Sequence, residues 1–300
     1  MKAVVVNNLV KQYGTKKDTV QALRGISFAV EKGELFGIIG PDGAGKTSLL
    51  RILTTLLIPE GGQATVDGLD VVKDFKAIRQ RVGYMPGRFS LYQDLTIAEN
   101  LEFFATIFNT TIEENYDLIK DIYSQIEPFK DRRAGKLSGG MKQKLALSCA
   151  LIHKPSVLFL DEPTTGVDAV SRKEFWEMLR GLKKQGITIL VSTPYMDEAG
   201  LCDRVALLQT GQILTIDTPD GVIDHFKHPL LAVKSDRMLP LLNRLKEFEG
   251  THNVYPFGEY HHLVLKPGFD INAVKSFVNA EVKPVRADIE DCFIDLMQTP

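Results

Sequence analysis

Hydrophobic positions near the start of the chain recur in short runs with the period of a β-strand. Residues 3–10 (AVVVNNLV) and residues 26–30 (ISFAV) predict two strands. A polar loop containing Tyr13 and Gly14 is expected to join them. We therefore expect an antiparallel sheet in the first 35 residues.

The spacing of apolar residues then changes from that of a strand to that of a helix. Residues 34–40 (ELFGIIG) form an apolar strand, and residues 45–57 (GKTSLLRILTTLL) carry helical spacing directly after a glycine-rich turn. Residues 90–150 are expected to be mostly helical. A capping box formed by Thr96 and Glu99 predicts where one of these helices begins.

A second group of buried elements follows the helical section. Residues 156–163 (SVLFLDEP) predict a strand, residues 171–185 a helix, and residues 187–192 (ITILVS) another strand. Alternation of strand, helix and strand implies a parallel sheet. Pro194 stands just beyond the carboxyl end of the last strand, where α/β proteins usually place their chemistry.

The pattern changes again from about residue 229. Short strands alternate with helical runs in the order β-α-β-β-α-β, which predicts a small α+β unit. We place the boundary near residue 225, giving domains 1–225 and 226–300. The expected strands are 230–235, 251–257, 261–267 and 282–288, and the expected helices are 238–248, 271–279 and 289–297.

Composition adds constraints on partners and environment. Hydrophobic residues at 44% and charged residues at 25% indicate a folded globular protein. A net charge of −2 gives no broad field for nucleic acid, so no nucleic-acid partner is expected. The three cysteines fit neither a disulfide framework nor a zinc spacing, and they are expected to be core residues: Cys149, Cys202 and Cys292. No apolar run approaches about 18 residues, so we expect no membrane span and no secretion signal.

The glycine-rich turn carries the motif G-x-x-x-x-G-K-[ST] between a strand and a helix. In this setting, backbone N–H groups surround phosphates and the helix start adds positive potential. Lys46 is expected to reach the outer phosphates, and Thr47 to bind Mg²⁺. The expected nucleotide-binding residues are Gly40, Pro41, Asp42, Gly43, Ala44, Gly45, Lys46, Thr47 and Ser48.

Two acidic residues end the strand at residues 156–163. Asp161 is expected to hold Mg²⁺, and Glu162 to act as the general base on the attacking water. Two acids at a strand end are more often a helix cap or a surface pair, but the phosphate loop favours the catalytic interpretation.

Between these motifs, Leu137, Ser138, Gly139 and Gly140 open a helical run. The order of phosphate loop, LSGGMKQ, LFLDEP and TTGVD resembles the ATP-binding cassette (ABC) ATPases over residues 1–225. The resemblance implies an α/β P-loop NTPase fold with a parallel core sheet, an antiparallel β subdomain and a helical subdomain at about residues 90–150. A small α+β domain would follow.

The resemblance also implies a head-to-tail pair of cassettes that binds ATP and Mg²⁺ between them. Ser138 and Gly140 would then contact ATP held by a partner cassette. Tyr13 resembles the aromatic residue that stacks on adenine, although it could also be an ordinary sheet-edge tyrosine. Asp168 resembles a residue of the loop that touches the opposite site.

At two positions the sequence departs from the family pattern. Gly87 stands where the family has a glutamine, and Pro194 where it has a histidine that contacts the γ-phosphate. Neither replacement has a side-chain hydrogen-bonding group. We therefore expect ATP binding but slow hydrolysis, in an asymmetric pair with a second, fully equipped cassette; a homodimer with two slow sites is the alternative.

Residues 89–108 resemble cassettes that serve ABC-2 type exporters, including multidrug exporters. The implied partner is a separate membrane permease, which would hold this chain at the cytoplasmic face of the membrane. Phe89, Leu91 and Tyr92 could line the docking groove or could be the subdomain's own core. His261 and His262 are expected to be surface residues rather than metal ligands. A soluble ABC ATPase without a membrane partner, or a regulatory nucleotide-binding subunit, stays open as an alternative.

Overall fold

A computed structural model describes residues 1–15 and 18–298 of the chain. The chain divides into two compact units, Met1–Pro219 and the residues from Asp220 onward. This division lies a few residues before the boundary expected near residue 225, at the start of the short helix α7 (Pro219–Asp224). Among the described residues, no helix is both long enough and apolar enough to cross a membrane.

The first unit begins with an antiparallel sheet, as the sequence predicts. Its two long strands pair from one end to the other, with Tyr13 opposite Val20 and Gly14 opposite Thr19. The expectation that Tyr13 and Gly14 lie in a loop is therefore wrong, because the polar residues continue the hairpin beyond its buried half. The strand order is β2-β1-β4-β5, with β1 Lys2–Thr15, β2 Asp18–Glu31, β4 Gly61–Val66 and β5 Leu69–Asp70.

The central sheet of this unit is mostly parallel. Neighbouring strands β9, β3, β8, β7 and β6 run in one direction, and β10 pairs with β9 as an antiparallel edge. Every residue of β3, β7 and β8 is buried, which explains their continuous apolar runs. The strands are β3 Leu35–Ile39, β6 Val82–Met85, β7 Val157–Asp161, β8 Thr188–Thr193, β9 Arg204–Gln209 and β10 Gln212–Asp217.

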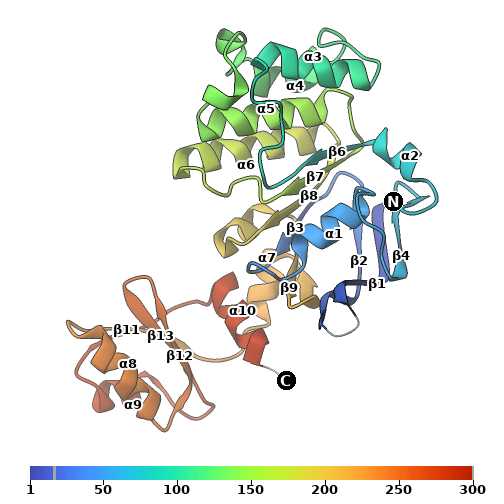
Figure 1. The fold of residues 1–300 in the computed structure, drawn as a ribbon. Helices are drawn as coiled ribbons and strands as arrows, with labels where there is room; N and C mark the ends of the chain where they lie inside the picture. The colour runs from blue at the N-terminus through green and yellow to red at the C-terminus, as the bar shows by residue number, and fades with distance from the viewer. Residues whose placement is uncertain (16–17, 299–300) are drawn as a thin grey trace. The chain divides into compact units, whose positions relative to one another are not determined.

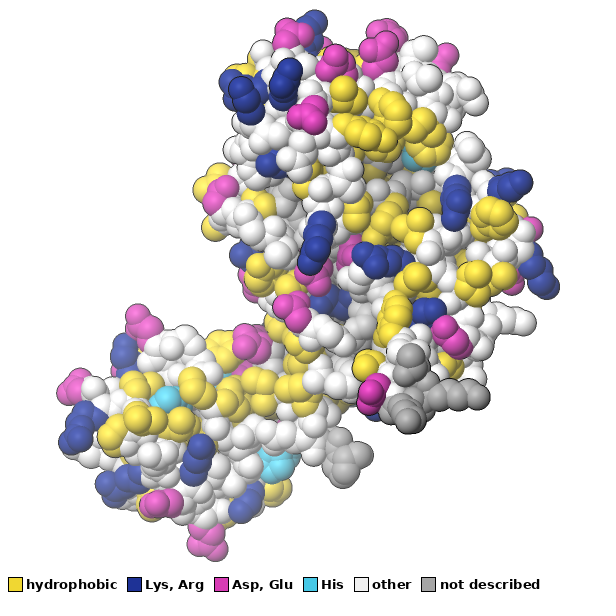
Figure 2. Space-filling model, in the orientation of Figure 1, with side chains coloured by type: hydrophobic (Ala, Val, Ile, Leu, Met, Phe, Trp, Pro, Cys, Tyr) yellow, Lys and Arg dark blue, Asp and Glu magenta, His cyan; other side chains and the backbone are white. Residues whose placement is uncertain are grey.

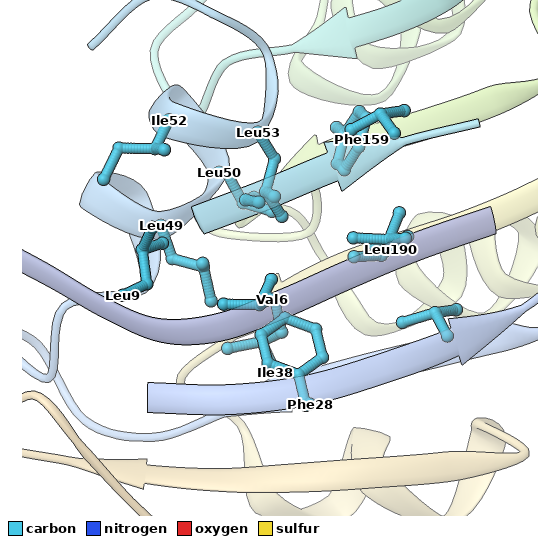
Figure 3. Packing of buried hydrophobic residues seen from close by; sticks show 14 of the residues in the cluster. Val6, Leu9, Phe28, Ile38, Leu49, Leu50, Ile52, Leu53, Phe159 and Leu190 are labelled. Atoms are coloured by element: carbon cyan, nitrogen blue, oxygen red, sulfur yellow. The ribbon is translucent and has the colours of Figure 1, made fainter. Parts of the chain in front are cut away.

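The core of the first unit lies where helix α1 (Lys46–Leu53) packs between the two sheets (Figure 3). Val6 and Phe28 come from the antiparallel sheet, Ile38 from β3, and Leu49 from α1. All four are buried, so α1 is held from both sides. This packing fixes the position of the glycine-rich turn, which precedes α1 directly.

Residues 90–150 are mostly helical, as predicted, and this segment lies at one end of the parallel sheet (Figure 1). Thr96 and Glu99 form the expected capping box, with each side chain accepting a backbone N–H of the other residue. The helices of this region and its flanks are α2 Phe75–Arg79, α3 Ile97–Ile107, α4 Tyr116–Tyr123, η1 Glu127–Phe129, η2 Ala134–Lys136, α5 Gly139–Leu151, α6 Ala169–Lys184 and η3 Met196–Leu201.

The second unit has the predicted β-α-β-β-α-β order. Its sheet is antiparallel throughout, with the order β12-β13-β11-β14. Helices α8 and α9 cover one face, where Val233, Leu245, Leu263 and Val274 are buried together. The elements are β11 Leu230–Lys234, α8 Met238–Glu247, β12 Thr251–Phe257, β13 Tyr260–Leu265, α9 Ile271–Phe277, β14 Glu281–Pro284 and α10 Ile289–Gln298.

The adjacent histidines of β13 are buried, so the expectation that they are surface residues is wrong. His261 is 4% exposed and its Nε2 lies 2.8 Å from the carbonyl oxygen of Met238 in α8. His262 is 7% exposed and its Nδ1 lies 2.6 Å from Asp291 Oδ1 in α10. Alternation along the strand sends the two rings to opposite faces, and both faces carry a helix.

The three cysteines are buried and unpaired, as expected. Burial raises the pKa of the Cys292 thiol to about 12, and the nearby Asp291 and Asp288 carboxylates add to this shift. A thiol of this kind stays protonated at neutral pH, which fits a packing role.

Candidate functional site

The glycine-rich turn after β3 leads into the first turn of α1. Gly43 has φ +79° and Gly45 has φ +110°, in the left-handed region that glycine adopts most easily. A Cβ on Gly45 would also lie 2.3 Å from the carbonyl oxygen of Ala22 in β2. The turn therefore needs glycine for its backbone shape and for the close approach of the neighbouring sheet.

Lys46 is held inside this turn. Its side chain is 3% exposed, and its Nζ donates to the carbonyl oxygens of Gly40 at 2.7 Å and Pro41 at 3.0 Å. Glu162 Oε1 lies 3.1 Å from the same Nζ. The carboxylate of Glu162 thus neutralises a buried lysine at the place where phosphate oxygens are expected.

Oxygen donors gather where α1 meets the ends of β7 and β8. Thr47 Oγ1 donates to Asp161 Oδ1 at 3.1 Å, and Ser192 Oγ donates to the same oxygen at 2.8 Å. Asp161 lies opposite Ser192 in the parallel sheet, so the strand pairing itself fixes this contact. A hydroxyl and a carboxylate are hard oxygen ligands of the kind that Mg²⁺ prefers. Thr47 and Asp161 therefore fit a Mg²⁺ ion held with nucleotide phosphates.

Glu162 has a strained backbone. Its φ is 49°, which is uncommon for a residue with a side chain. Its N–H donates to the carbonyl oxygen of Ser192 at 3.0 Å and to Ser192 Oγ at 3.1 Å. Strain held by such contacts is typical of functional sites. Ser192 was not among the residues singled out from the sequence, although its position at the end of a buried strand next to Asp161 is the signal that could have found it.

The turn, Ala22 and Glu162 line a cavity of about 240 Å³. Tyr13, which is 42% exposed, lies at the side of this region, and its hydroxyl is 3.1 Å from Ser48 Oγ. The ring of Tyr13 is thus placed by β1 next to the start of α1. Its predicted contact with adenine stays a prediction.

The predicted signature residues lie at the start of a different helix. Ser138 caps α5, with its Oγ accepting the N–H of Met141 at 3.3 Å. A Cβ on Gly140 would lie 2.9 Å from Ser171 Oγ, so α5 and α6 approach closely at their first turns. None of the residues 137–140 lines the cavity at the phosphate loop. Within one chain, the signature residues therefore lie outside the cavity formed by the phosphate loop.

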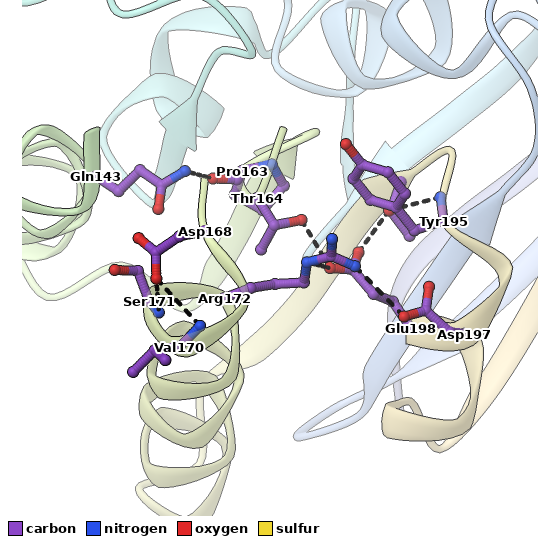
Figure 4. A network of polar contacts seen from close by, with 11 residues as sticks. Gln143, Pro163, Thr164, Asp168, Val170, Ser171, Arg172, Tyr195, Asp197 and Glu198 are labelled. Atoms are coloured by element: carbon purple, nitrogen blue, oxygen red, sulfur yellow. Dashed lines mark hydrogen bonds and ion pairs between the residues drawn. The ribbon is translucent and has the colours of Figure 1, made fainter. Parts of the chain in front are cut away.

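Asp168 caps the helix that follows (Figure 4). Its Oδ1 accepts the N–H of Val170 at 3.1 Å and of Ser171 at 3.0 Å. These hydrogen bonds, led by that of Ser171, hold the pKa of Asp168 below its usual range. In this chain Asp168 fixes the turn beside the signature helix, and its predicted contact across a dimer stays a prediction.

The position of Gly87 explains why a larger residue is absent there. A Cβ on Gly87 would lie 2.9 Å from the carbonyl oxygen of Asp161. The segment after β6 therefore passes against the end of β7 with no room for a side chain, and it lines a cavity of about 160 Å³ with Gly139, Gln143 and Glu162. The family's glutamine is therefore missing at the position where the backbone comes closest to Asp161.

Pro194 directly follows β8, and a buried polar network replaces a simple turn there (Figure 4). Glu198 is 1% exposed and accepts hydrogen bonds from Thr164 Oγ1 at 2.8 Å and Thr193 Oγ1 at 2.5 Å. Arg172 lies 3.8 Å from the same carboxylate and over the ring of Tyr195. Hydrogen bonds and an ion pair thereby join the segment after β8 to the loop after β7, through side chains for which the sequence predicts no role.

A large apolar cavity lies between the parallel sheet and the helical segment. Its volume is about 800 Å³, and Figure 2 shows hydrophobic side chains gathered over the region of α3 on the face in view. Leu91, Phe104, Ile107 and Phe108 are among its lining residues. Phe89 instead lines the smaller cavity beside Gly87. Of the three residues expected at a docking groove, Leu91 lies at this cavity, and Tyr92 is 51% exposed with its ring against Phe103.

Comparisons with known proteins agree with this geometry. Residues 23–165 match the family model described as ABC transporter. The chain is 37% identical over 302 residues to the probable multidrug ABC transporter ATP-binding protein YbhF of Escherichia coli (strain K12), covering 98% of this chain and 52% of that relative. It is 38% identical over 215 residues to the ABC transporter ATP-binding protein NatA of Bacillus subtilis (strain 168), covering 70% of this chain and 87% of NatA.

Two solved structures are similar over most of the first unit. One is the dimeric ATP-binding cassette MJ0796 in a post-hydrolysis state bound to ADP and Pi, with a TM-score of 0.65 and 25% identity over 72% of this chain and 98% of that one. The other is cbiO1 of Clostridium perfringens, with a TM-score of 0.65 and 27% identity over 75% of this chain and 91% of that one. The chain belongs to the ATP-binding subunits of ABC transporters, and its nucleotide-binding unit is an ABC ATPase.

Proposed function

We propose that this chain is the ATP-binding subunit of an ABC-2 type export system and drives transport by a separate membrane subunit. The printed names of several relatives support export: multidrug transport for YbhF, daunorubicin resistance for DrrA2 of Streptomyces coeruleorubidus, and Nod factor export for a Burkholderia lata protein. The chain spans about half the length of YbhF, so the activity of a whole exporter is part of the proposal. The transported molecule contacts another polypeptide and is left open.

The site of this chain binds MgATP and hydrolyses it slowly. Lys46, Thr47 and Asp161 supply the charge and the oxygen ligands for binding, and Glu162 supplies a base. The observation that supports slow hydrolysis is that Gly87 has no side-chain carbonyl for the metal and Pro194 has no hydrogen-bond donor. The loss of one preorganised group typically costs about 10²-fold in rate, and losses within one site are not additive.

The signature residues of one cassette are expected to meet the phosphate loop of the other cassette in a dimer. Residues 137–140 do not line the cavity at the phosphate loop of the same chain, which supports a head-to-tail pair. Ser138 and the exposed first turn of α5 would donate to nucleotide on the partner. The intact signature of this chain and its altered own site favour a pair with a second, fully equipped cassette over a homodimer.

The apolar cavity beside α3 is the proposed docking place for a helix of the membrane subunit. Its volume of about 800 Å³ and its lining by Leu91, Phe104 and Ile107 suit the apolar face of a helix. Docking there would hold this chain at the cytoplasmic face of the membrane.

Copurification under MgATP tests the proposal. Tagged full-length Glu162→Gln chain is isolated from detergent-solubilised membranes of its host. We expect a membrane permease and a second cassette to copurify, and Ser138→Arg to release the cassette but not the permease. Ser124→Arg is the matched control, because Ser124 is exposed at the end of α4. Recovery of the chain without any membrane protein contradicts the export role, and recovery with only its own copies contradicts the asymmetric pair.

A further inference from the structure

Three side chains of the second unit converge although they lie far apart in the sequence. His228 precedes β11, His252 lies in β12, and Asp295 lies in α10. The possible ligand atoms, one from each residue, all lie within 4.8 Å of one another. The two imidazole rings are stacked, with centroids 4.6 Å apart and planes 15° apart, and His252 Nε2 lies 3.9 Å from Asp295 Oδ1.

We propose that His228, His252 and Asp295 bind a divalent transition-metal ion, with Zn²⁺ as the best fit. Two imidazole nitrogens and one carboxylate oxygen form a donor set that Zn²⁺ accepts, with water in the fourth position. Mg²⁺ and Ca²⁺ are disfavoured because they prefer oxygen ligands alone.

The spacing is close to that of a formed site. Three atoms at the corners of a triangle with sides of 4.8 Å lie about 2.8 Å from its centre, whereas Zn–N distances are about 2.0–2.1 Å. Each ligand atom therefore has to move by less than about 1 Å. The two stacked imidazole rings also have to rotate about their side-chain bonds, because a bound ion lies in the plane of each ring that ligates it.

A β-bulge supports the assignment. Thr251 pairs with Leu265 and Asn253 with Val264, so His252 is the additional residue between two consecutive pairs. Strict alternation would send His252 to the face of Val254, which packs in the core beneath α8 and α9. The bulge instead turns its ring to Asp295 of α10.

The other two ligands are also held in place. His228 precedes Pro229, which restricts its backbone to extended conformations, and Phe226 packs edge-on against its ring. Asp295 lies one helical turn after Asp291, which is fixed by its bonds to His262 and Tyr255. An ion bound here would tie the segment before β11 to α10 and so would fix the entry of the chain into the second unit.

Metal titration of the full chain tests the site. Chain stripped of metal is titrated with Zn²⁺ against a chromophoric chelator, without nucleotide. We expect one equivalent to bind, and His228→Ala, His252→Ala and Asp295→Asn each to weaken binding by at least about 100-fold. His225→Ala is the matched control, because His225 is an exposed histidine of the same segment, and it should bind as the wild type does. Far-UV circular dichroism and protection of β13 amides from hydrogen exchange confirm that the second unit of each variant is folded.

Hydrogen exchange is a second measurement, and it shows where the ion binds. Hydrogen exchange should slow on Zn²⁺ addition at residues 226–228 and in α10, and it should not slow in His252→Ala. Absence of stoichiometric Zn²⁺ binding, unchanged affinity in all three ligand variants, or a loss of affinity equally large in His225→Ala overturns the proposal. None of these results depends on ATP hydrolysis or on a transport partner.

Discussion

The contact between Lys46 and Glu162 predicts that the catalytic carboxylate competes with ATP. Lys46 Nζ is almost completely buried, and Glu162 Oε1 lies 3.1 Å away. Phosphate oxygens that reach Lys46 must therefore take the place of this carboxylate. Glu162→Gln keeps a hydrogen-bond acceptor of the same shape and removes its charge.

The size of the effect follows from the hydrogen bond that is weakened. A hydrogen bond to a charged group contributes about 1.5–3 kcal/mol. The ammonium of Lys46 stays charged in Glu162→Gln, so the amide oxygen keeps a bond near the lower end of this range, whereas the carboxylate is near its upper end. Replacing the carboxylate by an amide thus removes about 1–1.5 kcal/mol of competition with the nucleotide. This corresponds to about 5- to 12-fold tighter binding.

The assay is equilibrium binding of a non-hydrolysable ATP analogue with Mg²⁺, at protein concentrations where the chain is monomeric. Glu113→Gln is the matched control, because it makes the same change of a carboxylate to an amide at an exposed side chain outside the site. We expect it to change the affinity by no more than about 2-fold, since exposed charges interact weakly.

Equal or weaker binding by Glu162→Gln, relative to the wild type, would refute the competition. So would an equal gain in Glu113→Gln, because the effect would then come from net charge and not from the contact with Lys46. Hydrolysis should fall in Glu162→Gln in either case, so the two roles of this residue are measured separately.

Three further predictions concern other parts of the chain. Pro194→His should raise kcat by about 10-fold or more, because it restores a hydrogen-bond donor. Gly87→Gln should raise kcat less, because a Cβ at this position would lie against the carbonyl oxygen of Asp161. Steady-state ATPase assays of both variants test these predictions. Asp291→Ala should lower the unfolding free energy of the second unit by about 3 kcal/mol, measured by hydrogen exchange in β13, because it leaves His262 without its buried partner. Burial would raise the pKa of Asp291, but its hydrogen bonds, the one with His262 foremost, outweigh burial and hold the pKa below its usual range. The stability that ionised Asp291 contributes should therefore be complete above the ordinary aspartate pKa and should be lost as the pH falls through the lowered pKa.

The sequence predicts most of the fold because the local signals agree with the final packing. Continuous apolar runs predict β3, β7 and β8, and these strands are buried in full. The capping box at Thr96 marks the start of α3 correctly. The order of elements in the second unit is also predicted correctly, since the hydrophobic residues of each strand and helix recur with the spacing typical of that element.

The errors arise where the environment of a residue is set by distant segments. His261 and His262 look polar and exposed in isolation, but α8 and α10 cover them from opposite sides. Tyr13 lies in a polar stretch, yet it pairs with Val20 in a continued hairpin.

The candidate site was predictable in its motifs and not in its supporting contacts. Lys46, Thr47, Asp161 and Glu162 come together as expected, because strand ends of a parallel sheet share one edge. The role of Glu198 depends on tertiary contacts with the loop after β7, so no local pattern reveals it, whereas Ser192 could have been found from its place at the end of a buried strand. The cluster of His228, His252 and Asp295 likewise joins three separate segments.

The central claim is that this chain holds ATP and turns it over slowly. The most direct measurement is the chemical identity of the nucleotide that stays bound to the purified full chain after incubation with MgATP and rapid removal of free nucleotide. We predict that most of the bound nucleotide is still ATP after several minutes, and that Lys46→Ala retains none. Bound nucleotide that is mostly ADP within seconds, or equal retention by Lys46→Ala, would contradict the account.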